Sequence, residues 1–522
     1  LTLLSASFVL IHGSSLALLA NIVSLMLLSA SAVSPQSSAL SNLLHTVFSI
    51  GGSPAFIVTA VSSRNNQPGA PKTAIRVLTL AIPVVLALLF FFVYQNANPL
   101  FENFTEKINL NFISLLWFFF TLSGLLVAYG FIAGKRIADL DKWENDQDEM
   151  QFTPRSSNLW RPDTAFTILM VLLNLMLVMI NILDVNYLYL GAGMPEGLTH
   201  KQFVHNGVHM LILSIVMGMI CIVFFIKRIE PGKSRKLANR LIFLWVLQNL
   251  MMVVSTGFRN HLYIHEALLT YKRIGVYYWL VFAGLGLMTL MLMIRNNRSA
   301  WHLIRINSLL AAVILVFSSA ADWDKNISCY NLGKIKYMAS LDKKYMISLS
   351  EGNLPLLYRI KNDPDFNTDS VYHYQSQLKY LNTAALDGKL YDFMKKNQEG
   401  DWRSFNIRRD RVKTEMMTLA LTGKLSQLDL SGKRISSLAP IQFIKDLKTL
   451  HLPASMEFSQ QLCNELNSFK DLETLHLDRV RTIDILYLKK LNVKKLVCAN
   501  TSPVVLNQMR QALQMEVLVA VK

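Results

Sequence analysis

Long apolar segments separated by short polar gaps occupy roughly the first three-fifths of the chain, and the remainder reads as an ordinary soluble domain. A membrane-spanning helix needs about 20 predominantly apolar residues. The pattern therefore predicts an α-helical polytopic membrane bundle of about nine transmembrane helices. The nine segments are 7–33, 40–62, 75–95, 112–134, 164–190, 206–227, 238–257, 273–294 and 303–320.

The first two segments have unusual features. The first begins LTLLSASFVL, without a charged region or a small-residue cleavage site, and we expect it to span the membrane rather than to be a removed signal peptide. The second contains IGGSPAF, whose two glycines and proline leave a broken or re-entrant helix as the alternative to a full span. The composition agrees with a membrane protein, because 52% of the 522 residues are hydrophobic, 17% are charged and the mean hydropathy is +0.32.

Lysine and arginine are unevenly divided between the gaps. The gaps after the second, fourth, sixth and eighth segments, with their flanks, contain 17 of them, and the opposite gaps contain 5. Because basic residues concentrate on the cytoplasmic side, the amino terminus is expected inside the cell. The chain after the ninth segment, from about residue 325, is then expected on the other side of the membrane.

Four leucine-rich stretches recur near the C-terminus: LSQLDL (425–430), LKTLHL (447–452), LETLHL (472–477) and VKKLVC (493–498), at spacings of 22, 25 and 21 residues. This period and pattern are typical of leucine-rich repeats, with an amphipathic helix pair as the alternative. Alternate residues of each strand would point outward on a concave sheet. These residues are Gln427, Asp429, Thr449, His451, Thr474 and His476.

The predicted organisation is a transmembrane domain over 1–324, a helical linker or cap over 325–420 and a small α/β leucine-rich-repeat-like domain over 421–522. Within the linker, YQSQLKYLNTAAL and GKLYDFMKKN are amphipathic at helical spacing. Such repeats usually bind macromolecules through their concave face, so we expect a protein partner.

Residues 325–522 carry 30 Lys and Arg against 20 Asp and Glu, with the densest basic run at RSFNIRRDRVK (403–413). This run faces either anionic lipid head groups or an acidic partner, or it is simply a solvated surface. Nucleic acid is not an expected partner on the outer side of a membrane. Membrane lipids are expected around the bundle.

The four cysteines and the known catalytic motifs give no sign of an active site. Cys463 and Cys498 could bond between neighbouring repeats, but free buried thiols are favoured. The sequence lacks G-x-x-x-x-G-K-[ST], G-x-G-x-x-G and G-x-S-x-G. We therefore expect no cofactor and favour a protein that is not an enzyme.

Three polar residues follow one face of the fifth predicted helix: Asn174, Asn181 and Asp184. An intramembrane carboxylate is costly and normally has a partner, and three cations on the same side could reach it. Gln248 and Asn249 on the seventh helix could join by hydrogen bonds. The stripe indicates either a polar cavity that opens outward or a clamp between helices. The three cations are Arg259, Lys272 and Arg273.

The stretch RNHLYIHEALLTYKR (259–273) and the stretch HNGVH each carry two histidines spaced i, i+4. Four imidazoles at one membrane surface could hold zinc, but Leu269 stands where an H-E-x-x-H motif needs its second histidine. Interfacial anchors are the favoured interpretation, and no metal is predicted. The histidines are His205, His209, His261 and His265.

Several stretches resemble a bacterial integral membrane family designated domain of unknown function four-one-five-three, with its relative four-one-seven-three. They are NPLF, WRPDTAF, LNLMLVMINILDVNYLYLG, FVHNGVHMLILSI, RNHLYIHEALLTYKRIGVYYWL, DWDKNISCYNL and LPLL, over roughly residues 75–360. The resemblance implies the bacterial inner membrane, with the C-terminal domain in the periplasm, and no particular reaction. It also implies that certain positions follow a family pattern: Asp184, His205, Arg259, Tyr271, Lys272 and Arg273.

These observations favour a non-enzymatic inner-membrane scaffold or accessory subunit that presents a periplasmic repeat domain to another envelope component. The alternative is a transporter or lipid-handling protein with an outward-facing polar cavity around Asp184 and Arg259–Arg273. A histidine-ligated metalloenzyme is a third hypothesis.

Overall fold

The computed structural model describes residues 1–35, 37–53, 115–132, 162–188, 200–229, 232–334, 342–361, 378–400 and 404–519, together with 137, 140–142 and 144. Five helices in these ranges are long and apolar enough to cross a membrane. The chain is therefore a mostly helical, membrane-embedded protein with a smaller parallel sheet near its C-terminus. The five helices are α2 (Ser15–Val33), α9 (Pro162–Leu188), α11 (Lys233–Ala267), α12 (Tyr271–Arg295) and α13 (Ala300–Ser318).

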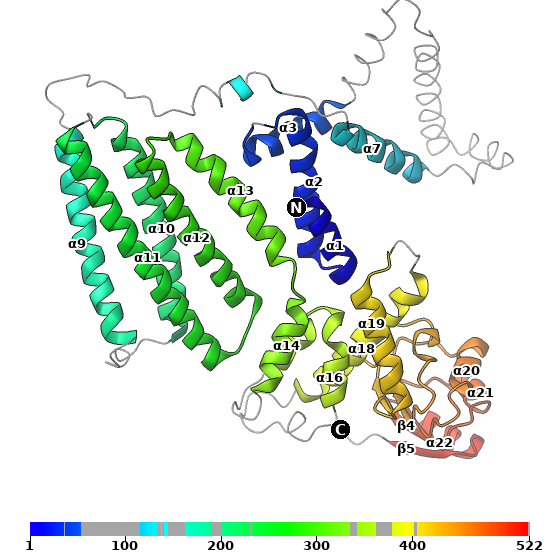
Figure 1. Cartoon of the computed structure of the whole chain (residues 1–522). Coiled ribbons are helices and arrows are strands. Elements are labelled where there is room, and N and C mark those ends of the chain that lie inside the picture. Colours follow the sequence, from blue (N-terminus) through cyan, green and yellow to red (C-terminus); the bar gives the residue numbers. More distant parts are fainter. Residues whose placement is uncertain are drawn as a thin grey trace, which may run out of the picture.

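Helices α9 to α13 stand side by side, with α10 (His200–Ile226) among them (Figure 1). Helix α11 is central, because it packs against α9, α10 and α12. Phe166, Ile222 and Leu287 are fully buried between them, whereas many outward-facing side chains, such as Leu175 and Val254, are apolar and exposed. An apolar exterior of this extent is stable only in lipid.

The predicted single helix over 7–33 is wrong, because the chain turns inside this segment. Helix α1 (Thr2–His12) ends at Gly13, whose φ of 57° is left-handed, and Ser14 then caps α2 by accepting a hydrogen bond from the Ala17 amide at 3.2 Å. The Thr2 hydroxyl reaches the Ser24 carbonyl at 3.0 Å, so the two helices form an antiparallel hairpin.

Other predicted segments correspond to shorter helices or fall outside the described residues. Helix α3 (Ala39–Gly51) covers the first half of segment 40–62, and α7 (Leu115–Ile132) covers most of 112–134. Segment 75–95 lies outside the described residues. The predicted count of nine spans therefore depends partly on residues that are not described.

The globular part lies at one end of the bundle. Helices α9, α11 and α13 end there and α10 and α12 begin there (Figure 1). Successive helices thus run in opposite directions, as the predicted topology requires. The opposite end carries basic residues such as Arg228, Lys233 and Arg295, so the charge asymmetry and the helix directions agree.

Among the described residues, six helical elements lie between the bundle and the sheet. Helix α18 contains the described part of the first amphipathic segment and the whole of the second, and α19 follows it. The elements are α14 (Trp323–Gly333), α15 (Lys343–Ser348), η2 (Glu351–Asn353), α16 (Leu354–Ile360), α18 (Leu378–Glu399) and α19 (Ile407–Leu421).

Five parallel strands form one sheet in the order β1-β2-β3-β4-β5. The predicted leucines align across it, because Leu428 pairs with Leu450, Leu450 with Leu475 and Leu475 with Leu496, and all four are buried. The strands are β1 (Gln427–Asp429), β2 (Thr449–His451), β3 (Thr474–Asp478), β4 (Lys495–Ala499) and β5 (Glu516–Val519), and the returns include η4 (Ala439–Ile441), α20 (Gln460–Asn467), η5 (Thr482–Asp484), α21 (Ile485–Leu488) and α22 (Pro503–Ala512).

Strand β5 was not predicted, although it starts 21 residues after β4 and continues the repeat spacing. Gln514, Val517 and Val519 stand at the three expected leucine positions, which hid the signal. Cys463 and Cys498 are buried free thiols, which confirms that prediction.

Candidate functional site

Polar side chains connect α9 and α11 inside the bundle. Gln248 Nε2 donates to Asn174 Oδ1 at 3.0 Å, and Asn181 Nδ2 donates to the Gln248 carbonyl at 3.3 Å. Asn174 also donates to the Leu241 carbonyl at 3.1 Å. These bonds join two parallel helices along the predicted polar stripe, and such bonds fix helix packing where no water competes.

The stripe ends in an ion pair between Asp184 and Arg259. The Arg259 guanidinium donates to Asp184 Oδ1, and both side chains are less than one-tenth exposed. Arg259 is thus the one of the three expected cations that binds this carboxylate. A buried pair of this kind neutralises a charge that would otherwise be very costly in the membrane.

The other two cations have different surroundings. Arg273 donates to the carbonyls of Ala267 and Leu268, where α11 ends, and stacks over the Tyr263 ring at 4.1 Å. A cation is favourable at a helix C-terminus, which carries partial negative charge. Lys272 is exposed. The predicted basic cluster therefore does not act as one site: Arg259 pairs with Asp184, and Arg273 binds the end of α11.

The histidines do not form a metal centre in the part of the chain that the structure describes. His261 and His265 are both exposed, and the side chains of His205 and His209 lie outside the described residues. No group of three or more His, Cys, Asp or Glu that could hold a metal occurs among the described residues. An interfacial position at the end of α11 remains the simpler interpretation of His261 and His265.

The loop between α11 and α12 is held by the globular part through backbone atoms. Asn331 accepts a hydrogen bond from the Leu269 amide at 2.8 Å and donates to the Leu269 carbonyl at 3.0 Å. The Tyr345 hydroxyl accepts from the Tyr271 amide at 3.0 Å. Leu268 has a φ of 67°, which is rare for a branched residue, so these contacts stabilise an unfavourable backbone conformation.

Asp322, which caps α14, and Asp324 in its first turn complete this contact. We call the contact of the loop between α11 and α12 with Asn331, Tyr345, these two aspartates and Arg408 the seam. Asp324 accepts hydrogen bonds from the Tyr271 hydroxyl at 2.8 Å and from Ser350. Arg408 at the start of α19 lies 3.3 Å from Asp322 and 3.4 Å from Asp324. All three charged side chains are close to nine-tenths buried, so the seam is an internal ion-pair network.

Sequence reasoning missed the seam. The stretches DWDKN and RSFNIRRDRVK were both noticed, but nothing in either stretch says that they meet. Tyr271 was predicted as a site residue, and the structure gives it a partner, Asp324.

A further buried ion pair covers the open edge of β1. Asp387 accepts from Lys361 Nζ at 2.7 and 2.9 Å, from the Tyr358 hydroxyl at 2.5 Å and from the Asp429 amide at 2.8 Å. The last bond replaces the pairing that a neighbouring strand would supply. Burial raises the pKa of Asp387, and the Lys361 ammonium opposes this effect.

Lys389 on α18 is enclosed by oxygen atoms. Its ammonium donates to the carbonyls of Ile347, Leu349 and Ser350 at 2.9, 2.5 and 3.0 Å and to Asn353 Oδ1 at 3.1 Å. Burial lowers the pKa of Lys389 to about 8. This side chain joins α18 to the segment before α16.

The predicted concave residues share one side of the sheet. Asp429, His451 and His476 occupy the same register position on β1, β2 and β3, and Gln427, Thr449 and Thr474 occupy the position two residues earlier. The two imidazoles stack, with ring centroids 3.7 Å apart and an interplanar angle of 10°. Burial lowers the pKa of His476 to about 4, and it lowers that of His451 as well. Both rings are therefore neutral at pH 7 and can share a surface without repulsion.

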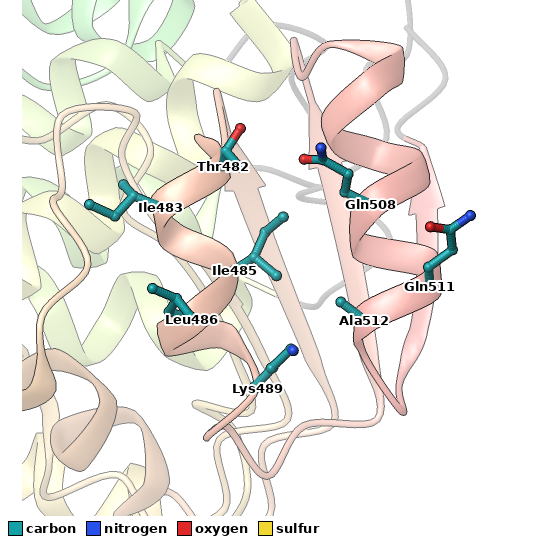
Figure 2. A pocket seen from close by; sticks show the side chains of 8 residues that line it. All are labelled: Thr482, Ile483, Ile485, Leu486, Lys489, Gln508, Gln511 and Ala512. Carbon is teal, nitrogen blue, oxygen red and sulfur yellow. The ribbon is translucent and has the colours of Figure 1, made fainter.

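A groove of about 660 Å³ lies among the return segments, between η5 and α21 on one side and α22 on the other (Figure 2). Ile483 and Leu486 are exposed beside it, with Lys489, Gln508 and Gln511 around them. It lacks paired titratable groups among its lining residues, so it does not resemble a catalytic site.

Comparison with known proteins gives one family. The sequence model described as Domain of unknown function (DUF4153) matches residues 1–360, which confirms the predicted resemblance and extends it to the first residue. The match ends with α16, so Asp322 and Asp324 lie inside it and Arg408 lies beyond it. Searches of curated proteins and of solved structures gave no match.

Proposed function

This chain belongs to the DUF4153 family, and we propose that it is a non-enzymatic scaffold or accessory subunit of the bacterial inner membrane. In this proposal the sheet domain is a leucine-rich-repeat domain in the periplasm, and its concave face binds a protein of the cell envelope. The bundle fixes the domain to the membrane.

The observation that carries the proposal is the outward row of side chains across β1, β2 and β3. Its threonines, glutamine and imidazoles can donate and accept hydrogen bonds on a surface built from an in-register ladder. The spacing of the strands supports the leucine-rich-repeat assignment. Extended surfaces of this kind are suited to a macromolecule rather than to a small substrate.

The seam supports a presenting role, because it holds the globular part against the bundle. Asn331 binds both backbone groups of Leu269, and Arg408 pairs with two aspartates. A flexible tether would need none of these buried contacts. A fixed orientation lowers the entropic cost of engaging a partner that is itself bound to the membrane.

The alternative, a transporter or lipid-handling protein, would use a polar cavity at Asp184. The ion pair between Asp184 and Arg259 and the hydrogen bonds of Asn174, Asn181 and Gln248 give these groups partners inside the bundle. These contacts favour a clamp between helices, and we propose the structural role for them.

Photo-crosslinking in native membranes tests the proposal. A benzoylphenylalanine is introduced at position 474 on the concave side or, as the matched control, at position 483 beside the groove. We expect one stoichiometric partner in mild detergent and a crosslink to it from 474 and not from 483. We also expect the double substitution Thr449→Arg and Thr474→Arg to abolish co-purification. A chain that purifies alone, or a partner retained by the double variant, contradicts the proposal.

A further inference from the structure

Two large apolar side chains are exposed at the start of α19. Phe405 is 57% exposed and Ile407 is 47% exposed. They flank Asn406, which caps α19 by accepting a hydrogen bond from the Arg409 amide at 2.8 Å. Exposed apolar residues are common singly, but a Phe and an Ile two positions apart form a patch whose place in the molecule needs an explanation.

This patch lies at the membrane end of the globular part. Asn406 packs against Gly13, so closely that a Cβ on Gly13 would lie 2.7 Å from Asn406 Nδ2. Next to Gly13, His12 Nε2 donates to the Ala320 carbonyl at 2.8 Å. Helix α2 begins here and α13 ends here, and both are candidate membrane spans (Figure 1). This level is therefore one surface of the bilayer.

The chemistry of the patch suits the interface between head groups and acyl chains. Phe and aliphatic side chains on the apolar side of an interfacial helix insert at this boundary, and basic side chains nearby bind lipid phosphates. Arg409 and Lys413 follow at a spacing of four residues, on one side of the helix. Arg409 Nη1 donates to the Ser404 carbonyl at 3.1 Å, and a guanidinium has further N–H groups that can contact a phosphate. Arg408 is not available for this purpose, because it pairs with Asp322 and Asp324 in the seam.

We propose that the start of α19 is a membrane anchor, in which Phe405 and Ile407 insert at the boundary between lipid head groups and acyl chains and Arg409 contacts lipid phosphates. The occupant of the patch is thus the phospholipid surface beside the hairpin of α1 and α2. This contact would hold the globular part at a second point, away from the loop between α11 and α12. It does not depend on whether the concave face binds a partner.

The test uses the full chain in phospholipid vesicles, with Cys221→Ser and Cys329→Ser as the background. Phe405→Cys is labelled with the environment-sensitive fluorophore NBD, and vesicles carry a nitroxide quencher on their acyl chains. The matched control is Leu421→Cys, at the other end of α19, where Leu421 is 74% exposed. The helix rise separates the two sites by about 20 Å. We expect blue-shifted, strongly quenched emission from position 405 and weak quenching from position 421.

Equal quenching at the two positions would overturn the anchor. A disulfide between two copies through position 405 would also overturn it, since a second copy would then cover the patch. Adding Arg409→Gln should lower the quenching at 405 in vesicles that contain phosphatidylglycerol. Unchanged quenching in those vesicles would refute the phosphate contact.

Discussion

Replacing Asp387 by asparagine tests how strongly the repeat domain depends on its covered edge. The Asp429 amide and the Tyr358 hydroxyl donate to different oxygens of Asp387, so asparagine keeps one oxygen for the Asp429 amide and places its NH2 group at the Tyr358 hydroxyl, whose oxygen can accept from it. The variant removes the charge that Lys361 contacts at 2.7 and 2.9 Å. Both charged side chains are buried. Removing one partner of a buried ion pair typically costs about 3–5 kcal/mol, because the remaining charge loses its compensation. The helices from α14 onward share one hydrophobic core with the sheet. At about 2–4 °C per kcal/mol for a folding unit of roughly 200 residues, the unfolding temperature should fall by about 6–20 °C.

The protein contains its own reporters for this measurement. Cys463 and Cys498 are buried thiols of the repeat domain, so a dye that fluoresces on reaction with thiols records its thermal unfolding in detergent. The background again carries Cys221→Ser and Cys329→Ser. The matched control adds Lys361→Met to Asp387→Asn, which removes both charges. We expect the double variant to recover most of the lost stability. A double variant as unstable as Asp387→Asn, or no shift in the single variant, would refute the reasoning.

Three further predictions concern the bundle, the seam and the buried lysine. Arg259→Met should lower the thermal stability of the purified protein by about 3–5 kcal/mol. Adding Asp184→Asn should restore part of this stability. Equal stability of wild type and Arg259→Met would argue against the clamp. Asn331→Ala should speed hydrogen exchange at the Leu269 amide, because the acceptor of that amide is lost. Asn331→Asp keeps an acceptor oxygen, so the Leu269 amide should exchange more slowly in it than in Asn331→Ala. Identical exchange in the wild type and both variants would contradict the contact. For Lys389, the folded pKa of about 8 lies below the ordinary lysine pKa of 10.5, so the unfolded chain binds more protons between these two pH values. Stability should therefore rise by about 3 kcal/mol as the pH rises from 8 to 10.5, in unfolding temperatures measured across this range, and Lys389→Met should remove that rise.

The repeated leucines predicted more of the sheet than any other signal. A hexamer with leucine at alternate positions fixes which side chains face inward, so the register of Leu428, Leu450, Leu475 and Leu496 follows from the sequence. The last strand escaped prediction because Val517, its one buried residue, stands where the pattern expects leucine. Pattern recognition by residue type fails where packing accepts any apolar side chain of similar volume.

Hydropathy did not predict the turn between α1 and α2 or the contacts of the seam. Segment 7–33 is mostly apolar, so hydropathy fits one helix as well as two, and Gly13 with Ser14 marks the turn. The partner of Asp184 had three candidates in reach, and the choice of Arg259 depends on how α9 and α11 are rotated about their axes. The seam joins Asp324 to a residue 84 positions later, and no local pattern encodes such a distance.

The sequence separation between the aspartates of the seam and Arg408 also sets the order in which the parts of the protein can fold during synthesis. Asp322 and Asp324 leave the ribosome before Arg408, by 86 and 84 residues. The helices before them can enter the membrane while both carboxylates still lack this arginine, so docking of the globular part is a late step that follows insertion. A nascent chain interrupted before Arg408 would leave an acidic rim on an otherwise finished bundle.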